Sequence, residues 1–197
     1  MITLDVSPNS ATISLINNVQ SFTSTLSGYS QHRSLAGARW GVSLGWFNRS
    51  NSEGRRLTAQ INSLAGPVGT FKVKIPEKNQ GLALGVGKVR GANQSGNVLI
   101  TDGWTANQTA MLKAGDWIEC NQQVFQVAED VNSNSSGNAS IKISPAIRRT
   151  PTDNQDVITD NPHFHLRRLT GSSFNSELSP SIAGPLYAFG LEAMEID

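Results

Sequence analysis

The sequence predicts a mainly β protein, with a β-sandwich-like domain that carries one helix and an inserted small β-barrel module. Three observations support this prediction. Apolar and polar residues alternate in many short segments, one segment has helical periodicity, and the composition changes at residues 76–81, where Pro, Gly and charged residues gather. The chain has 197 residues, which is long enough to bury a core in one large domain or two small ones.

Alternation with a period of two marks the expected strands. They occupy residues 11–16, 38–47, 70–75, 82–89, 97–101, 123–128, 139–144, 163–169 and 186–196. The passage from Leu112 to Arg149 is the most regular: it contains a turn (KAGD), a strand, a polar break (NQQ), a second strand, an Asn/Ser/Gly-rich loop and a third strand. It contains no obvious catalytic residue, so it reads as scaffold.

One segment, SNSEGRRLTAQINSLAGP, predicts a helix. Ser50 is the expected N-cap, and Glu53 three residues later completes a capping box that satisfies free backbone N–H groups. Leu57, Ile61 and Leu64 fall on one face, and we expect the helix to stop at Gly66-Pro67. The apolar face is expected to cover one sheet.

The domain division follows from the composition shift. We expect residues 1–80 and 180–197 to form the first domain, residues 81–170 to form the inserted barrel, and residues 171–179 to be a polar linker. The last strand, LYAFGLEAMEI, has one apolar face and needs a neighbouring sheet. Its expected partner is the long strand ARWGVSLGWF of the first domain.

Charge and cysteine content exclude several classes of function. The net charge is +1 and charged residues make up 16%, so we expect no nucleic-acid or membrane partner, since both call for clustered Lys and Arg. No apolar run approaches a transmembrane span and no leader is evident, so the chain is expected to stay where it is made. The single Cys120 excludes an internal disulfide and a cysteine-based zinc site, and is expected to be a packed small residue.

Candidate sites for metal or phosphate are weak. His163 and His165 lie two apart on an expected strand and could share an ion, but further ligands would have to come from His32, Asp102, Asp116 or Asp160. The glycines at 84–96 are followed by strand-like residues rather than by the helix that a phosphate loop requires, which favours β-bulges or close strand approach. We therefore expect no metal, no cofactor and no catalytic residue.

Four tryptophans leave two interpretations open. Trp40, Trp46, Trp104 and Trp117 could line a sugar-binding groove, as exposed aromatic rings do, or could fill cores and subunit contacts. The first interpretation would make the chain a carbohydrate-binding β module.

Several passages together resemble a known group of proteins. They are FTSTLSGYSQHRSLAGARWGVSL, where a strand-turn-strand leads into GARW, the capped helix with LAGPVGTFKV, and ITDGWTANQTAMLKAGDWIECNQQVFQVAEDVNSNSSGNASIKISPAIRR. This arrangement is similar to tail proteins of tailed bacteriophages and prophages, of the distal-tail or tail-tip (baseplate) type, over most of residues 20–170. Such proteins form rings, commonly hexameric, between the tail tube and the hub or fibres, with a β-rich belt domain and a second module outside.

The resemblance implies a structural virion protein without enzymatic activity. Residues 1–80 with 180–197 would form the ring-forming belt domain. Its partners would be itself, in a homo-hexameric ring, the tail tube protein, and hub or fibre proteins. The protein would be synthesised in the bacterial host cytoplasm and located in the virion tail. The low-charge, Asn/Ser-rich surface suits permanent neighbours, because few charges need desolvating on assembly. The alternative is a carbohydrate-binding β module that contacts host surface glycans.

Overall fold

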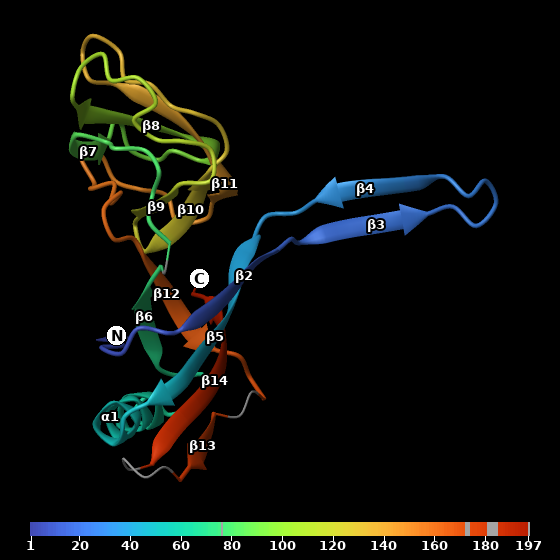
Figure 1. Cartoon of the computed structure of the whole chain (residues 1–197). Helices are drawn as coiled ribbons and strands as arrows, with labels where there is room; N and C mark the ends of the chain where they lie inside the picture. The colour runs from blue at the N-terminus through green and yellow to red at the C-terminus, as the bar shows by residue number, and fades with distance from the viewer. Residues whose placement is uncertain (76, 172–173, 181–184, 197) are drawn as a thin grey trace.

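A computed structural model shows that the chain is mainly β, with a single helix among the residues it describes (Figure 1). These are residues 1–197 apart from 76, 172–173, 181–184 and 197. These residues form three sheets, of seven, five and two strands. The mainly β fold class is therefore confirmed.

The seven-stranded sheet forms the lower body of the molecule in Figure 1. Its order is β1-β6-β12-β14-β5-β2, with β13 beside the first half of β14. The sheet is curled, and all its pairings are antiparallel except β1 with β6. The strands are β1 (Ile2–Thr3), β2 (Ser10–Ile16), β5 (Arg39–Arg49), β6 (Thr70–Lys74), β12 (His163–Arg168), β13 (Asn175–Ser179) and β14 (Leu186–Glu195).

The helix α1 (Asn51–Asn62) packs on the inner face of this sheet. The capping box is present as predicted, with the Ser50 hydroxyl and the Glu53 carboxylate each accepting from the other residue's backbone N–H. The helix ends at Asn62, earlier than Gly66-Pro67. Leu57 and Ile61 are buried in the core, so the predicted apolar face is confirmed. Among the described residues, no helix has the length and apolar character needed to cross a membrane.

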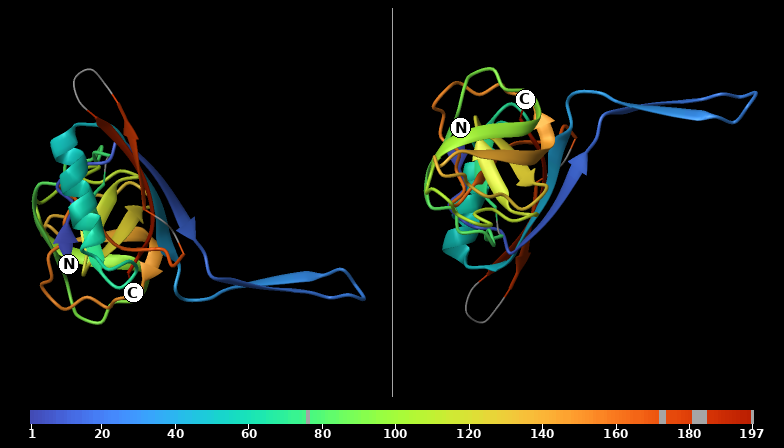
Figure 2. Two further views of the ribbon diagram at one scale, coloured as in Figure 1. Left: turned by 90° about the horizontal axis from the view of Figure 1, so that it is seen from below. Right: turned by 90° about the horizontal axis from the view of Figure 1, so that it is seen from above.

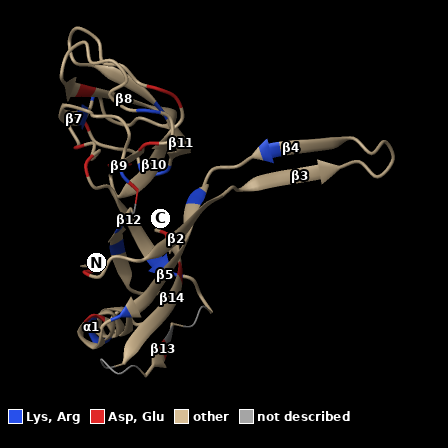
Figure 3. Ribbon diagram, viewed as in Figure 1, with Lys and Arg blue, Asp and Glu red and all other residues tan. Residues whose placement is uncertain are grey.

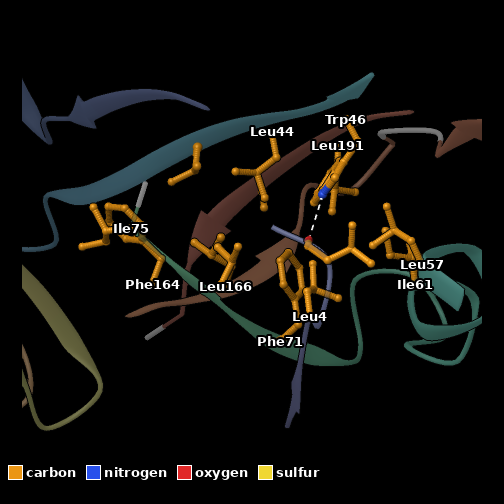
Figure 4. Packing of buried hydrophobic residues seen from close by; sticks show 14 of the residues in the cluster. Leu4, Leu44, Trp46, Leu57, Ile61, Phe71, Ile75, Phe164, Leu166 and Leu191 are labelled. Atoms are coloured by element: carbon orange, nitrogen blue, oxygen red, sulfur yellow. Dashed lines mark hydrogen bonds between the residues drawn. The ribbon is translucent and has the colours of Figure 1, made fainter. Parts of the chain in front are cut away.

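The core of the large sheet joins parts of the chain that are far apart in sequence (Figure 4). Trp46 is fully buried there, and its indole Nε1–H donates to the backbone oxygen of Val6 at 2.9 Å. The same cluster contains Leu4, Leu44, Leu57, Ile61, Phe71, Ile75, Phe164, Leu166 and Leu191. The strands and the helix therefore share one hydrophobic cluster.

The second module is a small curled sheet with its own core. Its order is β7-β8-β11-β10-β9. Residues 154–158 close it, because Val157 N–H donates to Gly87 O at 2.9 Å on one edge and Ile158 N–H donates to Glu119 O at 2.8 Å on the other. The strands are β7 (Gly85–Val89), β8 (Gly96–Trp104), β9 (Trp117–Cys120), β10 (Gln123–Val127) and β11 (Ala139–Ile147). These pairings make a small barrel.

The pairing of the last strand is as predicted. β14 runs antiparallel to β5, from Tyr187 opposite Arg49 to Met194 opposite Gly41. Deleting residues 182–197, part of which lies outside the described residues, would remove β14 and uncover the edges of both β5 and β12.

Two predicted boundaries differ from the structure. The 163–168 segment, expected in the inserted barrel, is β12 of the large sheet, where Phe164 and Leu166 join the first core. Residues 175–179, expected in a linker, form β13 beside β14. Alternation predicts that a strand exists but not which sheet it joins, since pairing is decided by contacts between distant residues. Excising residues 82–168 would therefore also remove a core strand of the large sheet.

Candidate interaction site: a projecting arm

A two-stranded ribbon projects from the body of the molecule (Figures 1 and 2). It consists of β3 (Val19–Thr23) and β4 (Ser30–Ser34) and continues the hairpin that β2 and β5 begin in the sheet. At its base, Leu35 N–H donates to Asn18 O at 2.8 Å and the Asn18 side-chain amide donates to Ala36 O at 3.0 Å. We call residues 19–34 the arm. Each side has about eight residues, so the arm extends about 25 Å from its base.

The tip of the arm is a tight loop. Ser24 N–H donates to Tyr29 O and Gly28 N–H donates to Ser24 O, each at 2.9 Å. Gly28 has φ of 67°, a left-handed conformation that glycine adopts without steric cost. The loop carries Leu26 outward, and its side chain is fully exposed.

The two faces of the arm differ in chemistry. On one face, cross-strand pairs satisfy each other: Ser21 Oγ bonds His32 Nδ1 and Thr23 Oγ1 bonds Ser30 Oγ, both at 2.9 Å. The other face carries Gln20, Phe22, Tyr29, Gln31 and Arg33. We call this second face the aromatic face.

The aromatic face is exposed to solvent although it carries two large aromatic side chains. Every residue of β3 and β4 is exposed, and the side chains of Phe22 and Tyr29 are 67% and 66% exposed. An isolated two-stranded ribbon is marginally stable in water at best, and clustered exposed apolar side chains mark interaction sites. The arm therefore has the properties of a surface that is completed by another molecule.

A buried polar cluster joins the barrel to the large sheet. Glu119 on β9 bonds the His165 ring on β12 at 2.7 Å and accepts from the backbone N–H of His163 at 2.8 Å. Burial acts to raise the pKa of the Glu119 carboxyl, but these bonds outweigh it and hold the pKa below its ordinary value. Burial lowers the pKa of His163. The cluster holds the two modules in one relative position.

A second polar cluster lies at the same junction. Glu195, fully buried at the end of β14, accepts from Val124 N–H at 2.8 Å and pairs with the Arg148 guanidinium. Burial raises the pKa of Glu195 in spite of these partners. Both carboxylates are satisfied by protein groups, and both side chains are buried, at 9% exposure for Glu119 and 0% for Glu195.

The four tryptophans are all buried, and each indole N–H has a protein acceptor. Trp40 and Trp117 meet edge to face at 5.0 Å between ring centroids, and Trp117 meets Phe164 at 5.7 Å, which fills the junction between the modules. Trp104 belongs to the barrel core and Trp46 to the core of the large sheet. None presents an exposed ring, so the tryptophans do not line a sugar-binding groove.

The remaining candidates have structural roles. His163 and His165 adjoin Glu119, but the described residues contain no group of three His, Cys, Asp or Glu side chains arranged to hold a metal ion. Cys120 is in the barrel core, where burial raises the pKa of its thiol to about 12. The glycines of 84–96 accompany a register shift in β7, and a Cβ on Gly87 would collide with the Trp104 ring.

The carboxylates singled out in the sequence do not converge. Asp116 is a turn residue, as expected, whose carboxylate accepts from Gln80, Gly81 and Lys113 N–H. Asp102 lies within β8.

The sequence indicated the arm only as a strand-turn-strand and did not predict that it would be exposed. The signal in VQSFTSTLSGYSQHRS was the combination of polar strands with isolated aromatic residues, since neither face has the continuous apolar pattern of a strand that packs on a core. No protein-family model matches the chain, and neither does any curated protein.

Proposed function

We propose that the protein is a structural subunit of a bacteriophage tail, which forms a ring near the distal end and joins the tail tube to the hub or fibres. The observation that carries the structural part of this proposal is the arm. Both of its faces are exposed, so a further strand or a packing surface for it has to come from a neighbouring molecule. The tail assignment rests on the resemblance of the GARW and KAGDW-to-PAIRR passages to distal-tail proteins.

The body of the molecule supports a scaffold role. The two modules meet through buried tryptophans and two satisfied carboxylate clusters, so they present a fixed surface. The surface is poor in charge, with a net charge of +1, which lowers the desolvation cost of permanent contacts. We propose no catalysis.

The test is the mass of the purified chain in solution. Mass photometry and light scattering at micromolar concentration should give one discrete oligomer, with six copies expected, and negative-stain images should show rings. A chain that remains monomeric over this range contradicts the ring. Gold-labelled antibody against the chain should then bind the distal end of tails in micrographs of particles, and label at the capsid or nowhere contradicts the tail assignment.

A further inference from the structure

On the side opposite the core and α1, no described element covers the large sheet. We call this side the outer face. Its central part has only small side chains, supplied by three adjacent strands: Ser10 and Thr12 of β2, Ser43 and Gly45 of β5, and Ala188 and Gly190 of β14. Small residues on a sheet face let another backbone approach closely.

The outer face is hollowed along these residues. A depression of about 450 Å³ runs between the Phe47 ring and Glu177 of β13. At its floor lies Gly190, where a Cβ would meet no atom within 4 Å, whereas its partner Gly45 is covered by the Phe47 ring, which a Cβ there would approach to 2.9 Å. The depression therefore has room for side chains from above, and Phe47, 51% exposed, offers them an apolar wall.

The arm and the outer face are complementary in charge. Arg33 is the only Lys, Arg, Asp or Glu residue in the arm, and in Figure 3 it is the single coloured segment there. It lies on the aromatic face, opposite Gln20. The depression is lined by one charged residue, the exposed Glu177. The outer face carries a second exposed carboxylate, Glu192, on the other side of Gly190, so the charges favour the contact, and the choice between Glu177 and Glu192 sets its orientation.

The two surfaces also match in spacing. On the aromatic face, Arg33, Gln31 with Phe22, and Tyr29 follow one another at every second residue. On the outer face, Ala188 beside Glu177, then Gly190, then Glu192 follow one another in the same way. Both repeats have the spacing of a pleated strand, about 6.6 Å. Phe22 falls over Gly190 whether Arg33 meets Glu177 or Glu192, and we choose Glu177 because it lines the depression.

A chain cannot make this contact with itself, because its arm points away from its own body in every view (Figures 1 and 2). We propose that the aromatic face of the arm docks in the depression of the outer face of a second copy of this chain, with Arg33 at Glu177 and Phe22 over Gly190. Each copy donates an arm and receives one, which two copies can do reciprocally in a dimer or several copies can do in succession in a ring; the proposed ring corresponds to the second arrangement. The inference rests on the proposed ring and names its subunit interface.

Substitutions on the arm test this contact. Phe22→Ser with Tyr29→Ser should raise the dissociation constant of the oligomer about tenfold or more, since exposed aromatics at such contacts dominate binding. The matched control is Thr23→Ala with Ser30→Ala, on the opposite face of the same strands, which should leave the dissociation constant unchanged. Circular dichroism should show an unchanged fold for both, because the arm contributes no residue to either core.

Charge exchange tests the orientation. Arg33→Glu and Glu177→Arg should each weaken the oligomer, and the double variant should recover wild-type association. The double variant Gln31→Cys, Gly190→Cys should also form intermolecular disulfides on oxidation, which give a ladder of multimers on non-reducing gels, whereas each single variant should not. Native Cys120 is buried and will not contribute to the ladder.

The outcomes separate the two proposals. If the wild-type chain forms rings that persist in the Phe22/Tyr29 variant and no ladder appears, the docking is wrong and the ring stands. The docking is also wrong if the control variant dissociates the oligomer as strongly as the aromatic one. If the wild-type chain is monomeric and no ladder forms, both the ring and the docking are wrong.

Discussion

The contacts of Glu119 at the junction between the modules allow a quantitative prediction of stability. The residue is 7% exposed, and its carboxylate accepts two hydrogen bonds from β12, one from the His165 ring and one from the backbone of His163. We consider the substitution Glu119→Gln, which preserves the shape of the side chain and removes its charge. The glutamine oxygen can still accept one of these bonds, but its NH₂ group cannot accept the other.

The expected cost follows from the lost charged bond. A hydrogen bond to a charged group contributes about 1.5–3 kcal/mol, and the low exposure here limits screening by solvent. In a chain of this length each kcal/mol corresponds to about 2–4 °C in Tm. Glu119→Gln should therefore lower the free energy of unfolding by about 1.5–3 kcal/mol at pH 7 and lower Tm by several degrees.

The effect should depend on pH with a defined sign. The pKa of Glu119 in the folded chain lies below its ordinary value of 4.5, so its charge stabilises the fold above pH 4.5. This contribution is lost as the pH falls through the folded pKa, because protonation removes the charge in the wild-type chain as well. The difference between wild type and Glu119→Gln should therefore be full at pH 7 and should shrink below pH 4.5.

The assay is urea unfolding followed by tryptophan fluorescence at a series of pH values, since Trp117 lies beside Glu119 at the junction. Glu129→Gln is the matched control: its carboxylate pairs with Lys142 on the surface, and both side chains are more than half exposed. The control should change stability by less than about 1 kcal/mol. An equal loss for Glu119→Gln at pH 7 and pH 4, or no loss at pH 7, would refute the role assigned to the carboxylate charge.

Three further predictions concern packing and capping. Leu57→Ala, at a fully buried site on α1, should cost about 2–5 kcal/mol by urea unfolding, whereas the 84% exposed Val68→Ala should leave stability nearly unchanged. Ser50→Ala removes the N-cap and should cost about 0.5–2 kcal/mol, and an unchanged Tm would mean that the cap contributes nothing. Gly87→Ala would press a methyl group into the Trp104 ring and should cost about 1–3 kcal/mol, with a changed near-ultraviolet dichroism signal; a variant as stable as wild type would contradict the close contact.

Much of the local structure could be predicted because its causes lie within a few residues. Ser50 and Glu53 are three apart, and Leu57 and Ile61 are four apart, so the cap and the apolar stripe of α1 are readable directly. The alternation in LYAFGLEAMEI likewise predicted a strand, and its need for a long partner predicted the pairing with β5. The use of glycine at 84–96 for close strand approach was also predictable, although not the Trp104 ring that requires it.

The polar clusters and the outer face could not be predicted in this way. Glu119 and His165 are 46 residues apart, and Glu195 reaches Val124 over 71 residues, so neither contact leaves a periodic signal. The membership of β12 in the large sheet was predicted wrongly for the same reason. The alternation of apolar and polar residues in HFHLRR is compatible with a strand in either sheet.

By itself the sequence determined the fold class, the capped helix and the positions of most strands, since these depend on local periodicity and turn chemistry. Only the tertiary structure decided that the four tryptophans are interior, that Glu119 meets His165, and that residues 19–34 leave the body as an arm. The physical reason is that exposure is a property of the whole arrangement. Phe22 has the side chain of a core residue, and it is exposed because no other element of the described chain covers it.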